Sequence, residues 1–97
     1  MKTISFEWDE KKNHSNIQKH KISFEEAKSV FNDLHARLIP DPDHSDKEER
    51  YILLGLSDDL KTLIVCHCYR ENSTVIRIIS ARKANRHEKS DYERQLK

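Results

Sequence analysis

The chain has 97 residues, of which 35% are hydrophobic and 36% are charged, and its net charge is +1. This length predicts a single domain over residues 1–97, with a small core under a heavily charged surface. The sequence contains neither an apolar run of about 18 residues nor an apolar leader, which argues against a membrane protein and a secreted one. With only two cysteines, Cys66 and Cys68, these features favour a cytoplasmic protein with reduced thiols.

The charge is unevenly distributed along the chain. Residues 1–60 carry 9 Lys/Arg and 13 Asp/Glu, whereas residues 61–97 carry 9 Lys/Arg and only 4 Asp/Glu. A basic half in a nearly neutral protein suggests that one surface meets an anionic partner. The alternative is a basic helix face that is simply solvated.

The chain is expected to begin with a strand and two helices. Residues 4–8 alternate apolar and polar side chains, as a half-buried strand does, and Asp9 can cap a helix over residues 10–20. That helix has a single apolar side chain, so flanking residues must hold it in place. A capping-box pattern at residues 23–26 predicts a second helix that ends near residue 32.

Strand candidates dominate the rest of the chain. They span residues 36–39, 51–56, 63–69 and 74–81. Short turns separate the last three, which favours antiparallel hairpins over crossover helices. Residues 83–96 predict a charged helix with few apolar side chains, which we expect to be loosely attached or to face a partner. The element order predicts an α+β fold, in which an antiparallel β-sheet carries two N-terminal helices and a C-terminal helix.

Residues spread from Phe6 to Tyr92 combine in an informative order and spacing. They are the segments 6–9, 23–27 and 76–84, together with Lys12, Asn13, Asn16, Lys19, His20, Asp43, His44, Glu49 and Arg50. In this combination the chain resembles the BrnT family of type II toxin–antitoxin toxins. One departure is Lys21, which stands where many relatives have glycine. A residue just after a helix often needs positive φ, which costs a lysine about 1 kcal/mol relative to glycine.

The resemblance implies a RelE-like fold and an endoribonuclease toxin. Such an enzyme cleaves RNA without a metal ion or other cofactor, and thereby blocks translation and growth in the cytoplasm. The implied partners are an RNA substrate, a BrnA-type antitoxin that neutralises the toxin, and promoter DNA bound only by the toxin–antitoxin complex. The alternative is a non-catalytic RelE-fold module that binds a protein or nucleic acid, because fold alone does not decide function.

RNA cleavage through the ribose 2′-hydroxyl needs a base, an acid, and cations that stabilise charge on the phosphate. The helix over residues 10–20 places polar candidates within about a third of its circumference. Lys12 and Asn16 are candidates for RNA binding, and Lys19 and His20 are candidates for catalysis. The helix dipole favours a cationic His20, which suits a phosphate clamp or an acid. An ordinary solvated face is the alternative.

A second group of candidates lies in and after the acidic loop 41–49. His44 and Arg50 could act as an acid and a phosphate clamp, because loops often carry catalytic side chains. Glu49 could orient Arg50 or serve as the base. The alternative is a set of surface residues in a flexible loop, in which an exposed Glu49 ion pair would matter little.

Arg77 interrupts the most apolar strand of the chain, so it must face water, a groove or a partner charge. We interpret it as a phosphate clamp. A three-residue turn before this strand would pair Arg77 with His67, whereas a two-residue turn would pair Ile78 with His67 and send Arg77 to the other face.

The end of the same strand adds two cations. Arg82 is a candidate clamp and Lys83 a candidate RNA contact, and surface charge at a helix entrance is the alternative. The segment Cys66-His67-Cys68 does not predict a metal site, because strand alternation places His67 on the face opposite to the cysteines. We interpret both cysteines as core residues.

Overall fold

The computed structural model describes residues 3–41 and 49–96. Along the chain the elements are β1 (Ser5–Glu7), α1 (Glu10–His20), α2 (Phe24–Ser29), the 3-10 turn η1 (Val30–Asn32), β2 (Arg37–Pro40), β3 (Tyr51–Leu56), β4 (Thr62–Arg70), β5 (Val75–Lys83) and α3 (Arg86–Arg94). These elements confirm the predicted α+β class. Within the described residues, no helix is long and apolar enough to cross a membrane.

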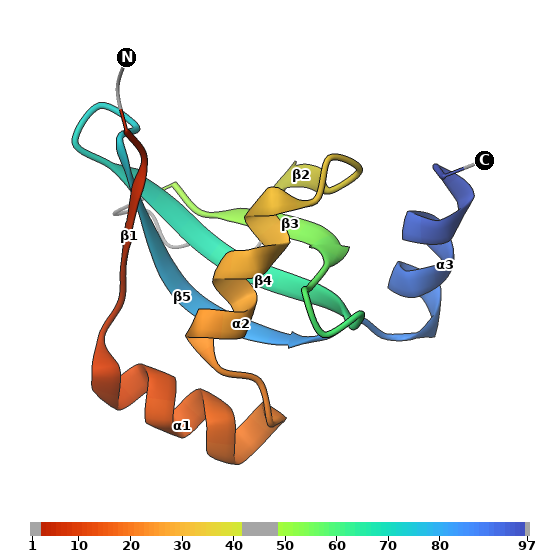
Figure 1. Cartoon of the computed structure of the whole chain (residues 1–97), viewed down its shortest axis with the longest axis horizontal. Helices are drawn as coiled ribbons and strands as arrows, with labels where there is room; N and C mark the ends of the chain where they lie inside the picture. Colours follow the sequence, from red (N-terminus) through yellow and green to blue (C-terminus); the bar gives the residue numbers. More distant parts are fainter. Residues whose placement is uncertain (1–2, 42–48, 97) are drawn as a thin grey trace.

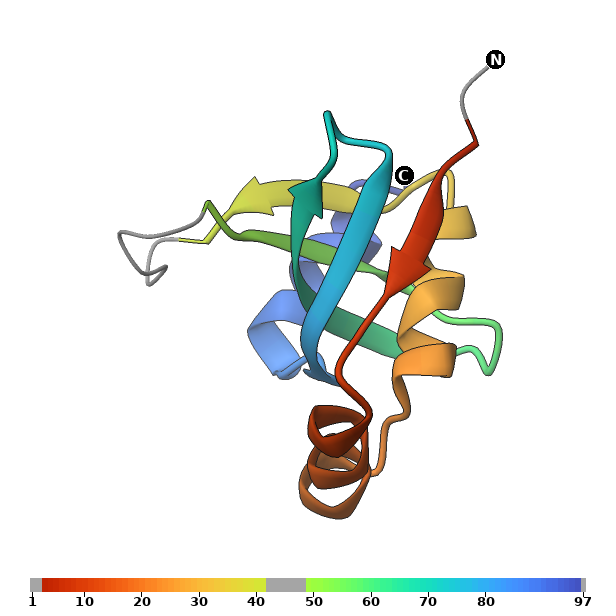
Figure 2. The same ribbon diagram turned by 90° about the vertical axis from the view of Figure 1, so that its left-hand side faces the viewer.

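The strands form one sheet in the order β1-β5-β4-β3-β2. The pairs among β2, β3, β4 and β5 are antiparallel, as the short turns predict. The pair of β1 with β5 is parallel, which departs from the predicted antiparallel sheet. Figures 1 and 2 show that α2 covers one face of the sheet and that α3 lies on the other.

The register of β4 and β5 decides which way Arg77 points. His67 pairs with Ile78, which matches the second of the two predicted registers, and Arg77 lies opposite Cys68. An irregularity between Cys66 and His67 shifts the register along the rest of the pair. Because side chains alternate between the faces of a sheet, Arg77 and Cys68 lie on the face away from α2.

The main core lies between the sheet and the N-terminal helices. Its buried side chains are Ile22, Phe24, Ala27, Val30, Leu53, Leu63, Val65, Ile78 and Ala81. Gly55 allows η1 to approach β3 closely, since a Cβ atom there would lie 2.8 Å from Val30 Cγ1 and 2.9 Å from Ala36 Cβ. The chain has no other glycine.

Polar contacts hold α1 in place, as its single apolar residue led us to expect. The Asn16 side chain is 6% exposed and donates to the backbone oxygens of Ile22 and Ala81, both at 2.8 Å. It also accepts from the Ala81 N–H at 3.1 Å. After the helix, Lys21 adopts a left-handed φ of 63° and its N–H bonds to the Ile17 oxygen. The strained conformation expected at Lys21 is therefore present.

The structure corrects the expectation that the C-terminal helix is loosely attached. Tyr92 of α3 is 4% exposed and packs with Leu54 and Ile64 on the second face of the sheet. Its hydroxyl donates to Asp33 Oδ2. At the start of α3, Glu88 completes a capping box with Asn85. The sequence pattern understated this attachment because one tyrosine supplies most of the apolar contact.

Candidate functional site

The sheet surface opposite α2 is only partly covered by α3. We call its uncovered part the open face, formed by Glu7, Asp41, Arg50, Cys66, Cys68, Arg70, Arg77 and Ser80. The strand pairs place Glu7 beside Arg77 and Arg77 beside Cys68. Tyr51 pairs with His67, so the preceding residue, Arg50, falls level with Cys68. The open face thus carries a row of polar groups across the sheet.

One carboxylate holds two guanidinium groups together on this face. Arg77 Nη1 donates to Glu7 Oε2 at 3.0 Å, and Arg70 Nε lies 3.5 Å from the same oxygen. The side chains are 35% exposed for Arg77, 50% for Arg70 and 41% for Glu7. A guanidinium carries five N–H donors in a planar fork, so both arginines can bind Glu7 and still present donors to an anion in solvent.

The Cys66 thiol on the open face is protonated at neutral pH. Burial, followed by the nearby Asp41 carboxylate, raises the pKa of Cys66 to about 11, against an opposing effect of Arg50. Cys66 Sγ donates to Asp41 Oδ2 at 3.6 Å. Because the thiolate is the nucleophilic form, this cysteine is poorly suited to nucleophilic catalysis.

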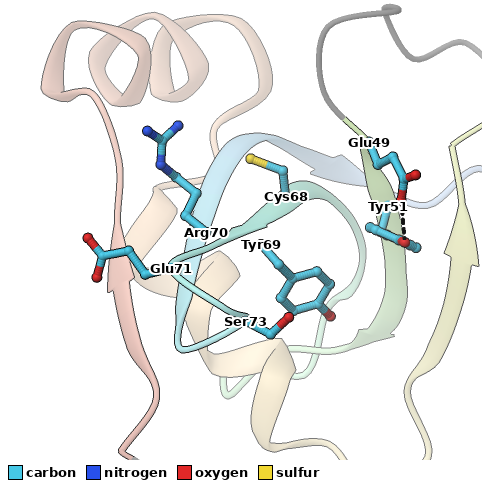
Figure 3. Close-up of a pocket in the computed structure, with 7 residues that line it drawn as sticks. All are labelled: Glu49, Tyr51, Cys68, Tyr69, Arg70, Glu71 and Ser73. Atoms are coloured by element: carbon cyan, nitrogen blue, oxygen red, sulfur yellow. Dashed lines mark hydrogen bonds between the residues drawn. The ribbon is translucent and has the colours of Figure 1, made fainter.

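A cavity of about 620 Å³ lies where β4 extends beyond the start of β3. We call it the β4-end pocket. Its lining residues are Glu49, Tyr51, Cys68, Tyr69, Arg70, Glu71 and Ser73. Figure 3 shows Cys68 and Arg70 on one side of β4, while Tyr69 points to the other side. The pocket therefore connects the open face with an aromatic surface around the edge of the strand.

His67 supports this aromatic surface from behind. Its side chain is fully buried, and burial lowers its pKa, so the ring is neutral. Nδ1 lies 3.1 Å from the Val65 oxygen and therefore carries the proton, which leaves Nε2 to accept from the Tyr69 hydroxyl at 3.3 Å. His67 lies on the face opposite to the cysteines, as predicted. Among the described residues, no group of three His, Cys, Asp or Glu side chains could hold a metal ion.

The polar candidates on α1 gather in a smaller cavity of about 210 Å³. Its lining residues are Lys12, Ser15, Asn16, Lys19, His20, Ile79 and Ser80. Ser80 pairs with Cys66 and belongs to the open face, so this basic stripe of α1 borders the open face at β5. Asn16 differs from its neighbours because both its amide nitrogen and its oxygen bond to backbone groups within the protein.

The remaining described candidates do not line the open face or the β4-end pocket. Arg82 makes a two-pronged contact with Glu88, at 2.8 and 2.9 Å, which raises the pKa of Arg82 and lowers that of Glu88. The guanidinium of Arg82 is thus bound to the first turn of α3. Lys83 is exposed at the end of β5. His44 lies outside the described residues.

Sequence reasoning missed four residues around the site. Arg70 and Glu7 join Arg77 on the open face, and Tyr51 and Tyr69 line the β4-end pocket. Alternation along residues 63–69 could have identified Arg70, because it shares a face with Cys66 and Cys68. The sequence could not indicate Glu7, because its position depends on the parallel pairing of β1 with β5.

The comparisons with known proteins agree with one another. A sequence model of the family described as ribonuclease toxin, BrnT, of type II toxin–antitoxin system matches residues 8–88. The crystal structure of the Brucella abortus ribonuclease toxin BrnT is similar to this structure, with a TM-score of 0.65 and 27% sequence identity. The match covers 87% of this chain and 100% of the Brucella chain. No curated protein matches the sequence.

Proposed function

The chain belongs to the BrnT family of ribonuclease toxins of type II toxin–antitoxin systems, and from this premise we propose that it is a metal-independent endoribonuclease that cuts RNA on its open face. We further propose that residues 1–97 form one domain that acts in the cytoplasm and blocks translation and growth. A BrnA-type antitoxin neutralises it, and the complex of the two proteins binds promoter DNA.

The arginines of the open face carry this proposal. Arg70 and Arg77 share one carboxylate and remain partly exposed, and Arg50 lies just before the neighbouring strand β3. When a 2′-hydroxyl attacks the phosphorus, negative charge grows on the phosphate oxygens. Fixed guanidinium donors stabilise that charge, because their planar fork matches two oxygens at once. We assign Arg50 and Arg77 to phosphate binding, as the sequence suggested, and add Arg70.

Glu49 is our candidate for the base that takes the 2′ proton. It lines the β4-end pocket with Arg70 and a second cavity with Arg50. Glu49 thus shares a cavity with each of two arginines that we assign to phosphate binding. His20 and Lys19 border the open face from α1, and His20 is our candidate for the acid that protonates the leaving 5′ oxygen. His44 remains a second candidate for that role.

Two sequence candidates keep their roles in this proposal, and two others take different ones. Lys12 and Lys83 stay RNA contacts, because both side chains are exposed. We assign Arg82 to holding α3 through Glu88, because its donors are used there. We assign Asn16 to holding α1 against β5, because its amide is bonded within the protein.

The test is RNA cleavage by the purified protein in excess chelator. A labelled single-stranded RNA should be cut at an undiminished rate, and the 5′ product should end in a 2′,3′-cyclic phosphate. The same RNA with a 2′-deoxy sugar at the cut position should stay intact, because it lacks the attacking hydroxyl. Activity that is lost in chelator and restored by one metal would contradict the proposal. Tight RNA binding without cleavage would instead favour a binding module.

A further inference from the structure

The β4-end pocket has an aromatic wall that phosphate chemistry does not require. We propose that this pocket holds one unstacked base of a single-stranded RNA, placed against Tyr51 and Tyr69. This inference rests on the proposed ribonuclease function and adds a substrate class to it. The base in the pocket belongs to a nucleotide whose phosphate lies at the arginines of the open face.

The aromatic wall is fixed in place before any ligand arrives. The Tyr51 and Tyr69 rings have centroids 5.5 Å apart, and the buried His67 ring lies 5.2 Å behind that of Tyr69. The Tyr51 hydroxyl donates to Glu49 at 3.1 Å, and the Tyr69 hydroxyl donates to His67. Both phenols are thus held by hydrogen bonds. A preordered surface loses little conformational entropy when a base stacks on it.

The polar wall of the same pocket supplies the contact to the phosphate. Arg70 and Cys68 line the pocket and also belong to the open face, and Arg70 shares Glu7 with Arg77. Base and phosphate are neighbouring parts of one nucleotide, so a single residue of RNA can reach the tyrosines and the arginines together. A cavity of about 620 Å³ has room for a base with bound water.

A base can enter this pocket only when it is unpaired. In a duplex the base is stacked between its neighbours and hydrogen-bonded to its partner strand, so its face is not available to tyrosine. Sequence-tolerant stacking on aromatic side chains is typical of proteins that bind single strands. The geometry therefore selects single-stranded segments and rejects duplex RNA of the same sequence.

The experiment measures binding of an RNA that cannot be cut. The probe is a fluorescein-labelled 2′-O-methyl octanucleotide, and a series of probes replaces each base in turn by an abasic site. We expect one position at which base removal weakens binding to the wild-type protein roughly 5- to 150-fold. Tyr51→Leu should weaken binding of the intact probe by a similar factor, while Tyr51→Phe keeps the ring and should bind nearly as the wild type does.

Combining the two changes distinguishes stacking from a general loss of affinity. If the base contacts Tyr51, base removal should have almost no effect on Tyr51→Leu, and annealing a complementary strand should weaken binding to the wild-type protein. Additive losses, equal binding of duplex, or no sensitive position in the wild-type scan would overturn the proposal. Even if Tyr51→Leu does not fold, a wild-type scan without a sensitive position overturns the proposal. These experiments measure binding and not cleavage. Their outcomes therefore test the base-binding pocket even if the protein fails to cut RNA.

Discussion

Arg77 stands where an arginine contributes little to stability. Its contact with Glu7 joins two partly exposed side chains, and such pairs contribute about 0–1 kcal/mol. We therefore expect Arg77→Ala to leave the melting temperature nearly unchanged while RNA cleavage falls roughly 100- to 1000-fold, as when other enzymes lose a transition-state donor. Arg77→Lys should restore only part of the rate, because it keeps the charge and loses the fork. Melting curves and cleavage rates for the three proteins check this.

The matched control is Arg94→Ala. Arg94 also has an acidic partner, Asp91, but it lies on α3 and is 72% exposed. The Arg94→Ala variant should have the melting temperature and the RNA cleavage rate of the wild-type protein. If Arg77→Ala folds normally and keeps the wild-type rate, then Arg77 has no part in catalysis.

Asn16 illustrates how a structural residue can resemble a functional one. Asn16→Ala leaves buried backbone groups of Ile22 and Ala81 without their partner, and we expect a loss of about 3 kcal/mol in the free energy of unfolding. The melting temperature should fall by roughly 10 to 20 °C. Lys12→Ala, in the same cavity, should melt normally and bind RNA more weakly. If the Asn16→Ala variant is as stable as the wild type but binds RNA poorly, then Asn16 contacts RNA and its structural role is wrong.

At the scale of elements, the end of α1 contains stored backbone strain. Lys21 has a φ of 63°, a conformation that glycine adopts without a steric penalty. Lys21→Gly should therefore stabilise the protein by up to about 1 kcal/mol, in spite of the more flexible unfolded chain. Urea unfolding of the two proteins measures the difference. Lys21→Ala is the informative control, since it removes the bond from Nζ to the Gln18 oxygen but keeps the strain, and it should give no gain.

The attachment of α3 should weaken in acid. Burial opposes ionisation of Asp33, but hydrogen bonds from Tyr92 and from the N–H groups of Leu56 and His35 outweigh it, and its pKa is lowered below the ordinary 3.8. A lowered carboxylate pKa stabilises the fold above the unfolded-state value, and this stabilisation is lost as the pH falls through the folded-state value.

Tyr92→Phe tests this attachment. It removes one donor to Asp33, and we expect it to lower the free energy of unfolding by about 1–2 kcal/mol at pH 7. The difference from the wild type should shrink as the pH falls below the ordinary 3.8 and through the lowered pKa of Asp33. Urea unfolding at pH 7 and pH 3 gives both values. An equal difference at the two pH values would show that the charge of Asp33 plays no part.

Most elements could be predicted because their determinants are local. The bounds of α1 follow from Asp9 and the pattern after it, and β3 begins and ends where β-forming residues do. The parallel pairing of β1 depends on contacts across the whole chain, so no local pattern indicates it. Only half of the predicted capping box forms at the start of α2. Ser23 accepts a hydrogen bond from the Glu26 N–H, but the Glu26 carboxylate accepts one from Ser57 and does not bond to the Ser23 N–H.

At the scale of the whole molecule, the fold brings together charges that are distant in sequence. Arg77 could be identified because an arginine among apolar residues is unusual, but its neighbours Glu7 and Arg70 come from other strands. The acidic side chains Glu25, Glu26 and Asp58 lie around a cavity beside α2, which is on the other side of the sheet. Arg70 and Arg77, from the basic second half of the sequence, thus lie on the face opposite to these acidic side chains.

This charge separation predicts how the antitoxin approaches. Complementary charges speed the encounter of two proteins, and salt screens them over about 10 Å at 0.1 M. We expect an antitoxin with an acidic or amphipathic segment that covers Arg77 and α3, and an association rate that falls roughly tenfold or more between low and high salt. Arg70→Glu should slow association most at low salt, because it reverses a charge on the open face. Asp58→Asn, on the acidic side, should leave the rate unchanged within about twofold. Stopped-flow mixing of toxin and antitoxin at several salt concentrations measures these rates. A rate that does not depend on salt, or equal effects of the two substitutions, would show that the open face does not guide the encounter.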